Sequence, residues 1–120
     1  MEIDAHNYMG YDAVTLGNHE FDNGLDTLAV ILKKAKFPIV CANYDVKGTP
    51  LEGIVKPYTI IRRAGLKIGV FGIGVNPIGL ITEKNFSPVK YLNPFSPFEF
   101  RPLILNLATS VLNLCPKRIF

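Results

Sequence analysis

Residues 15–24, TLGNHEFDNG, place several side chains that can bind a metal ion or transfer a proton directly after a short apolar run. Asn18 offers a neutral amide oxygen, a suitable ligand for a hard or borderline divalent metal ion. His19 can act as a metal ligand, an acid or a charge stabiliser. Asp22 can accept a hydrogen bond from the His19 ring and so fix its tautomer. The spacing predicts a site for metal-assisted or acid–base chemistry made of these side chains.

Each of these residues also has an ordinary structural interpretation. A single histidine in a loop is more often structural than catalytic. Asp22 or Asn23 could simply cap the following helix, and Asn23 is the better candidate for that role. Gly17 lets the chain turn and gives a bulky ligand close approach, and Phe21 is expected to anchor the loop in the core. The whole string GNHEFD favours function, because no helix cap or turn requires all of it.

The segments around this loop predict a parallel strand–helix–strand unit. Residues 12–16 are short and partly β-branched, which is typical of a strand covered on both faces. Apolar residues recur at helical spacing after Gly24, which predicts a helix over about residues 24–36 with three lysines in its last turn. Residues 39–42 then predict a second, parallel strand. Such folds bind ligands at the carboxyl edge of the sheet, where the polar loop would lie.

The remaining segments predict a hairpin between less regular stretches. Residues 2–9 are expected to be the last turns of a helix that Gly10 ends. Two β-rich runs flank Ala64-Gly65, which predicts a hairpin, and residues 45–57 before it are expected to form a loop. Prolines break regular structure after Asn93. A further helix is expected beyond Pro102, with one face made of Ile104, Leu107, Ala108, Val111 and Leu112.

Composition narrows the classes of function. The chain has 120 residues, of which 48% are hydrophobic, enough for one globular domain. Its formal charge of +3 comes from lysines and arginines placed singly or in pairs, so nucleic-acid binding is not expected. No apolar stretch reaches the roughly 20 residues of a membrane span, and the first residues lack the pattern of a signal peptide. Cys41 is interpreted as a small buried apolar residue, without a disulfide to Cys115.

Two further motifs are set aside. HEFDN lacks the second histidine of a zinc-protease motif, because Asn23 stands in its place. GIGVNP starts like a dinucleotide-binding motif, but Pro77 stands where the third glycine belongs. Tyr44 and Phe71 are both interpreted as core residues.

The stretch GYDAVTLGNHEFDNG resembles the third signature block of the metallophosphoesterase superfamily, in the form used by bacterial 5'-nucleotidases and UDP-sugar hydrolases. The similarity continues through FPIVCANYDV and KPYTIIRRAGLKIGVFGI and, more loosely, to about Pro94. The resemblance implies an α/β fold, namely part of an α/β/β/α sandwich. Residues 1–94 would be a fragment of the catalytic domain, and residues 95–120 a divergent or frame-shifted tail.

By this resemblance, Asn18 is expected to be a metal ligand and His19 the residue that stabilises the phosphoryl transition state or the leaving oxygen, with Asp22 as its partner. The parent reaction would be hydrolysis of a phosphate ester, typically of a nucleotide, by water held between two divalent ions of the Mn, Zn, Mg or Ca type. Relatives of this kind are commonly periplasmic or extracellular.

The chain alone is expected to be inactive and not to retain the metal pair. Similar proteins carry Asp-x-His and Gly-Asp blocks before this loop and His and Gly-His-x-His blocks after it; this sequence has no Gly-Asp block and no histidine after His19, and His6 and His19 are its only histidines. A lone Asn oxygen without a bridging carboxylate cannot hold a divalent pair against water. Two interpretations stay open: a fragment of a metal-dependent 5'-nucleotidase-like hydrolase, or a non-enzymatic gene remnant or small interaction module.

Overall fold

The computed structural model of the chain describes residues 2–96, 102 and 105–109. Its helices and strands are short. In chain order they are α1 (Ile3–Met9), the 3-10 turn η1 (His19–Phe21), α2 (Leu25–Leu32), β1 (Ile39–Val40), β2 (Tyr44–Asp45), β3 (Val55–Lys56), β4 (Tyr58–Arg63), β5 (Leu66–Phe71), α3 (Glu83–Phe86) and β6 (Lys90–Tyr91).

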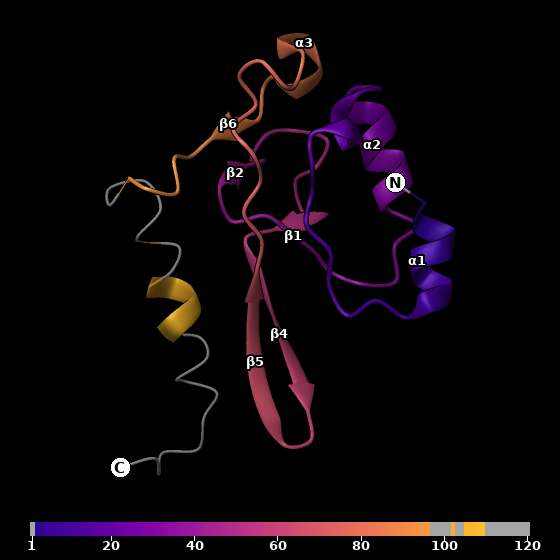
Figure 1. Cartoon of the computed structure of the whole chain (residues 1–120), viewed down its shortest axis with the longest axis vertical. Helices are drawn as coiled ribbons and strands as arrows, with labels where there is room; N and C mark the ends of the chain where they lie inside the picture. Colours follow the sequence, from indigo (N-terminus) through magenta and orange to yellow (C-terminus); the bar gives the residue numbers. More distant parts are fainter. Residues whose placement is uncertain (1, 97–101, 103–104, 110–120) are drawn as a thin grey trace.

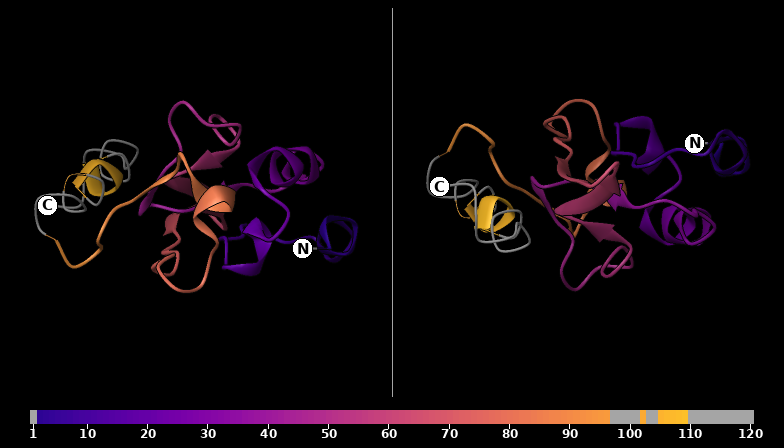
Figure 2. Two further views of the ribbon diagram at one scale, coloured as in Figure 1. Left: turned by 90° about the horizontal axis from the view of Figure 1, so that it is seen from above. Right: turned by 90° about the horizontal axis from the view of Figure 1, so that it is seen from below.

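The elements form a small body from which one hairpin extends. Helices α1 and α2 lie on one side of the strands, and the helical residues 105–109 lie on the other (Figure 2). The hairpin of β4 and β5 points away from the body at one end, and α3 lies at the opposite end (Figure 1). The strand order places β1 beside β3, β2 beside β6, and β4 beside β5.

The predicted parallel strand–helix–strand unit is present in a reduced form. β1 pairs in parallel with β3 on one side and, through Ile39, with Val14 on the other. The Val40 N–H donates to the Val14 carbonyl oxygen at 2.8 Å. The predicted extent of the first strand, residues 12–16, is wrong. Only Val14 makes a bridge, and Thr15 is exposed. Its partner β1 is two residues long, so the ladder has little length over which to continue.

α2 is shorter than the predicted helix over residues 24–36. Its N-cap is Gly24, with φ of 83° and no side-chain capping bond, so the prediction that Asn23 caps the helix is wrong. The three lysines predicted in its last turn lie after Leu32, where the helix ends. Asn7 of α1 then holds the chain beyond the helix, because its amide donates to the Lys34 carbonyl at 2.9 Å and accepts from the Lys36 N–H at 2.8 Å.

The end of α1 matches the prediction, and the predicted loop over residues 45–57 does not fully do so. α1 ends at Gly10, which has the left-handed conformation expected of a helix stop, with φ of 70°. The predicted loop over residues 45–57 is wrong in part, because β3 lies within it and Asp45 belongs to β2, which pairs with β6. Strands of two residues carry no period that a sequence pattern could reveal.

The predicted hairpin is confirmed. β4 and β5 pair in an antiparallel register that runs from Tyr58 opposite Phe71 to Arg63 opposite Leu66. Ala64 and Gly65 between them both have positive φ, of 50° and 76°, as a tight two-residue hairpin turn requires. The hairpin is a two-stranded sheet of its own.

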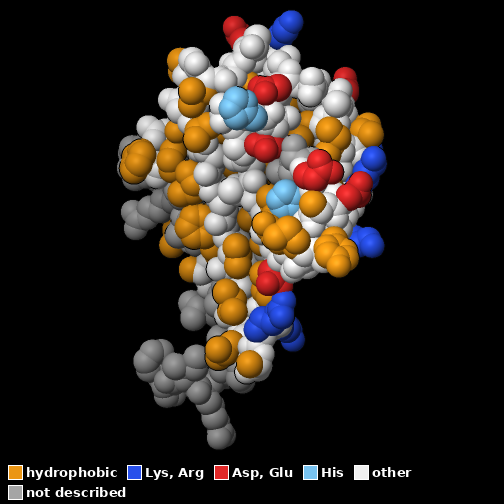
Figure 3. Space-filling view, turned by 45° about the vertical axis from the view of Figure 1, so that its right-hand side comes forward, with side chains coloured by type: hydrophobic (Ala, Val, Ile, Leu, Met, Phe, Trp, Pro, Cys, Tyr) orange, Lys and Arg blue, Asp and Glu red, His pale blue; other side chains and the backbone are white. Residues whose placement is uncertain are grey.

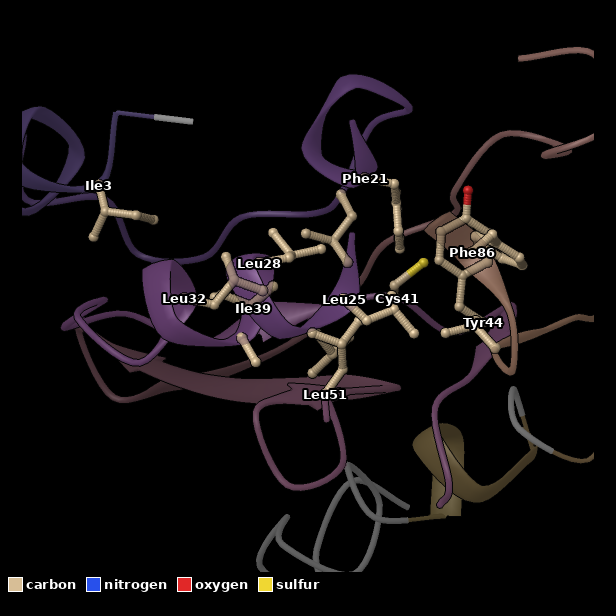
Figure 4. Packing of buried hydrophobic residues seen from close by; sticks show 14 of the residues in the cluster. Ile3, Phe21, Leu25, Leu28, Leu32, Ile39, Cys41, Tyr44, Leu51 and Phe86 are labelled. Atoms are coloured by element: carbon tan, nitrogen blue, oxygen red, sulfur yellow. The ribbon is translucent and has the colours of Figure 1, made fainter. Parts of the chain in front are cut away.

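The core lies between α2, β1 and α3, and Phe21 and Leu51 are completely buried in it. Phe21, Tyr44 and Phe86 group together at one end (Figure 4). Their ring centroids lie 5.1 to 5.8 Å apart. Tyr44 is therefore a core residue as predicted, whereas the prediction for Phe71 is wrong: it is 41% exposed and lies in the two-stranded sheet of β4 and β5.

The predicted helix beyond Pro102 is present in its described part, where residues 102 and 105–109 are helical. Leu107 is buried, as expected for the apolar face, but Ala108, predicted on the same face, is exposed. The other members of that face, Ile104, Val111 and Leu112, lie outside the described residues. None of the helices that the structure describes is long and apolar enough to cross a membrane.

Candidate functional site

The polar loop is built as a single turn of 3-10 helix. Asn18 precedes this turn and Asp22 follows it, with backbone bonds from the Phe21 N–H to the Asn18 oxygen and from the Asp22 N–H to the His19 oxygen, of 3.3 and 3.2 Å. Side chains three residues apart in a 3-10 turn are eclipsed. His19 and Asp22 therefore project from the same side of the loop.

The predicted contact between His19 and Asp22 is present. The His19 Nδ1 atom lies 3.1 Å from the Asp22 Oδ2 atom. When Nδ1 carries the proton it donates to the carboxylate, and Nε2 is left to interact with a ligand. The two side chains are 82% and 60% exposed, so as an ion pair they would stabilise the fold by at most about 1 kcal/mol. The pair is therefore accessible to solvent and adds little to the stability of the fold.

Phe21 anchors this exposed turn, as predicted. Its side chain is 0% exposed, and its ring lies 5.2 Å from that of Phe86 and 5.8 Å from that of Tyr44, between centroids. The face in Figure 3 shows both histidine side chains at the surface, with carboxylates beside each of them. The loop thus joins a buried ring to a polar, accessible tip.

Asn18 adjoins this pair at the start of the turn. It is partly exposed, and its amide makes no capping bond to η1, which leaves the side chain for another partner. Glu20, for which no role is predicted from the sequence, closes the turn instead: its Oε2 atom accepts from the Gly17 N–H at 2.7 Å. The signal for this was the three-residue spacing of Gly17 and Glu20, which matches half of a capping box.

Comparison with known proteins identifies the fold that carries this loop. No protein-family model matches the chain. Protein UshA of Escherichia coli (strain K12) is 39% identical over 89 residues, which are 73% of this chain and 16% of UshA. The 5'-nucleotidase precursor of Thermus thermophilus matches 91% of this chain and 21% of its own, with a TM-score of 0.75 and 27% identity. The calcineurin-like phosphoesterase YfkN of Bacillus subtilis matches 74% of this chain and 29% of its own, with a TM-score of 0.61 and 35% identity. The chain belongs to the metallophosphoesterase superfamily, of the 5'-nucleotidase type.

As a metallophosphoesterase chain, it has the predicted α/β fold, with a parallel strand–helix–strand unit followed by a β-hairpin. It spans 16% of the length of UshA. The catalytic and metal-binding roles predicted for individual residues are not decided by these similarities and stay predictions.

The described part of this metallophosphoesterase chain does not by itself fit a pair of divalent metal ions. Among the side chains that the structure describes, no group of three or more His, Cys, Asp or Glu residues is placed to hold a metal ion. At the loop, Asn18 offers one neutral oxygen, and the His19 Nδ1 atom is engaged with Asp22. A zinc ion in a protein takes about four ligands.

A buried amide that sequence reasoning missed holds the strands behind the loop. Asn43 is 0% exposed, and it forms two hydrogen bonds with the Gly74 backbone: its Oδ1 accepts from the N–H at 2.7 Å and its Nδ2 donates to the carbonyl at 2.9 Å. This pairing fixes the segment after β5 against the end of β1. The available signal was a single polar residue that ends the apolar run IVCAN.

The glycines of the GIG sequence serve this close packing. A Cβ atom on Gly72 would lie 2.2 Å from the Thr15 Oγ1 atom and 2.5 Å from the Val40 carbonyl oxygen. A Cβ atom on Gly74 would lie 2.3 Å from the Tyr44 ring. Both positions therefore require glycine, and a packing role accounts for the sequence that resembles a dinucleotide-binding motif.

The buried titratable groups near the loop are held in their neutral forms. Burial raises the pKa of the Cys41 thiol, and backbone hydrogen bonds at Gly74 and Asn43 offset part of this rise. Burial also raises the pKa of the Tyr44 hydroxyl far above its usual range, and the hydroxyl donates to the Val75 carbonyl at 2.6 Å. Cys41 and Tyr44 are therefore buried in their neutral forms, whereas the side chains of His19 and Asp22 are accessible to solvent.

Proposed function

We propose that this chain forms one part of the active site of a 5'-nucleotidase-like phosphoesterase. In this proposal His19, oriented by Asp22, binds the phosphoryl group of a nucleotide phosphate ester. Asn18 supplies one ligand to a divalent metal ion, of the Mn, Zn, Mg or Ca type, whose other ligands come from outside the described residues. The observation that carries the proposal is the 3.1 Å contact between the His19 Nδ1 and Asp22 Oδ2 atoms in an exposed turn.

The loop geometry gives His19 and Asp22 separate tasks. Asp22 accepts the Nδ1 proton and so keeps the imidazole in one orientation and one tautomer. In the protonated ring, Nε2 then donates a hydrogen bond to a phosphoryl or leaving-group oxygen, where negative charge increases in the transition state. Preorganised donors of this kind are worth about 10²–10³ in rate when they are removed singly.

The substrate class rests on similarity to longer proteins. The Thermus thermophilus relative is a 5'-nucleotidase precursor, and this chain covers 21% of it. We therefore assign residues 1–94 to a catalytic domain that hydrolyses nucleotide phosphate esters, outside the cytoplasm, and residues 95–120 to a divergent or frame-shifted tail. In this proposal the chain on its own has no phosphatase activity.

One observation favours the second candidate, a small interaction module without enzymatic activity. Large apolar side chains on the hairpin lie at the surface, with Leu66 65% and Ile68 43% exposed. Clusters of exposed apolar side chains commonly mark binding surfaces.

A chimera tests the proposed role of His19. The segment of E. coli UshA that aligns with this chain is replaced by the matching residues of this chain, and hydrolysis of nucleoside monophosphates is measured. We expect an active chimera in which His19→Ala lowers kcat by about 10²-fold or more. Asp26→Asn, an exposed acid on α2, is the matched control and should change kcat by less than about twofold. An active chimera that is indifferent to His19→Ala would refute the role.

The isolated chain provides the complementary measurement. The full chain is assayed with a nucleoside monophosphate and an aryl phosphate in excess manganese or zinc. We expect no turnover above that of buffer, because the described donors do not hold a metal pair. Turnover that His19→Ala abolishes would show that the chain is an enzyme by itself.

A further inference from the structure

Helix α3 contacts the polar loop although it lies far from it in the sequence. The Asn85 side-chain Nδ2 atom donates to the Asp22 carbonyl oxygen at 2.9 Å. The next residue, Phe86, packs its ring against that of Phe21, with 5.2 Å between centroids. α3 therefore holds both the buried ring of the loop and the backbone at its polar end.

The Asn85 bond completes the set of contacts that fix Asp22. The Asp22 N–H donates to the His19 carbonyl oxygen at 3.2 Å, and the Asp22 carboxylate lies 3.1 Å from the His19 Nδ1 atom. These two contacts are local to the turn and would move with it. The bond from Asn85 ties the following peptide group to a separate element, whose own position is fixed by the burial of Phe86.

Resting on the function proposed above, we propose that Asn85 is a positioning residue for His19. By holding the Asp22 carbonyl, Asn85 fixes the backbone from which the Asp22 carboxylate projects. That carboxylate then keeps the neutral His19 ring in its Nδ1-protonated tautomer, so that a proton taken up by the ring goes to Nε2, the nitrogen that donates to the phosphoryl oxygen in the proposed function. The bond of the Asn85 amide goes to the Asp22 backbone and not to the His19 ring, so its effect passes through Asp22.

The tautomer of His19 is a readout that a general stabilising role would not change. The full chain is labelled with 15N at its two histidines only, and the ring nitrogen shifts are recorded above the pH at which the rings lose their charge. His6 is an internal reference: its Nδ1 atom lies 2.5 Å from the Glu2 carbonyl oxygen, which can only accept, so this nitrogen carries the proton.

In the unaltered chain both rings should be protonated at Nδ1. Asn85→Ala should lower the ratio of the Nδ1-protonated to the Nε2-protonated form of His19 by about 2- to 10-fold, the change expected for loss of one exposed hydrogen bond. The His6 ratio should not move. Lys84→Ala, an exposed neighbour on the same helix, should leave both ratios unchanged.

Asn85→Asp keeps the shape of the side chain but removes the donor, and Asn85→Gln restores a donor. We expect the aspartate variant to lower the His19 ratio as alanine does, and the glutamine variant to recover part of it. If Asn85→Ala does not fold, the comparison of these two variants decides the matter. An unchanged His19 ratio in a folded alanine or aspartate variant would overturn the proposal, as would Nε2 protonation of His19 in the unaltered chain.

The UshA chimera separates this proposal from the proposed function. If Asn85→Ala shifts the His19 tautomer while His19→Ala leaves kcat unchanged, positioning stands and the catalytic role falls. If His19→Ala lowers kcat while Asn85→Ala changes neither the tautomer nor kcat, the catalytic role stands and positioning falls.

Discussion

The polar loop and the β4–β5 hairpin are held in opposite ways. The loop has irregular backbone bonding, but its Phe21 ring is 0% exposed and Asn85 reaches it from a distant helix. The hairpin has a regular six-pair ladder, yet it forms a separate two-stranded sheet with large apolar side chains at the surface. An exposed ion pair between Arg63 and Asp12 links its tip region to the body. Regular secondary structure and burial are thus separate properties of this fold.

This difference predicts where substitutions are costly. The loop depends on contacts between residues far apart in the sequence, so truncating a buried partner removes its support. The hairpin depends on its own turn and ladder, so its outer side chains are nearly independent of the body.

The largest effect is expected at the anchor of the loop. Phe21→Ala should lower the free energy of unfolding by about 3–5 kcal/mol, because it leaves a cavity between two aromatic rings. Ile68→Ala on the hairpin should cost less than about 1 kcal/mol, since Ile68 is already 43% exposed. Chemical denaturation of both variants measures the difference. Equal losses would show that the hairpin is embedded as firmly as the loop.

The buried amide behind the loop should rank next. Asn43→Ala removes both partners of the Gly74 backbone, which should cost about 2–3 kcal/mol, since each buried group left unpaired carries a desolvation penalty. Asn76 accepts one exposed bond from Ile78, and Asn76→Ala should stay within about 0.5 kcal/mol. The same denaturation experiment applies. If Asn43→Ala behaved like Asn76→Ala, the contribution of the Gly74 pairing would be negligible.

Alkaline pH should weaken the body through its buried acids. The folded-state pKa values of Cys41 and Tyr44 are raised above their ordinary values of 9.0 and 10.0. Deprotonation therefore favours the unfolded chain, so the stability is fully present below about pH 9 and falls as the pH rises further, by at most about 1.4 kcal/mol per pH unit for each group. Tyr44→Phe should show a shallower decline above pH 10 in urea unfolding. Parallel pH profiles for the two proteins would contradict the assignment.

The smallest effect on stability is expected on the hairpin surface. Replacing Leu66 and Ile68 together by threonine introduces a β-branched, polar residue that suits a strand at both positions. The change should alter the free energy of unfolding by less than about 1 kcal/mol. The same change should lower self-association, because exposed apolar strands promote it. Light scattering measures the mass in solution. A variant that unfolds instead would show that these side chains have partners in the body.

The sequence predicted local features of the site well. The Phe21 anchor and the contact between His19 and Asp22 follow from spacing within one turn, and the Ala64-Gly65 turn follows from residue type. What it could not predict depends on pairs of distant residues. Beyond the end of α2 at Leu32, the Asn7 side chain bonds to the backbone of Lys34 and Lys36, and no pattern within the helix shows these contacts.

The errors on the hairpin and among the short strands have the same origin. Phe71 has the type and spacing of a core residue, but its exposure depends on what packs against the two-stranded sheet of β4 and β5. The pairing of β2 with β6 joins Tyr44 to Tyr91 across half of the described chain and leaves no period in either segment. The Asn85 contact with Asp22 is also a tertiary bond, invisible in both local sequences.

The buried position of Cys41 allows the reactivity of its thiol to report local opening of the structure around it. Its thiol is 1% exposed and donates to the Asn43 Oδ1 atom, where the segment after β5 joins β1. A thiol-specific reagent can reach Cys41 only when that junction separates, and only the small thiolate fraction reacts. In a Cys115→Ser background, the rate of modification under native conditions would therefore measure how often the junction opens, without denaturant and without an enzymatic assay.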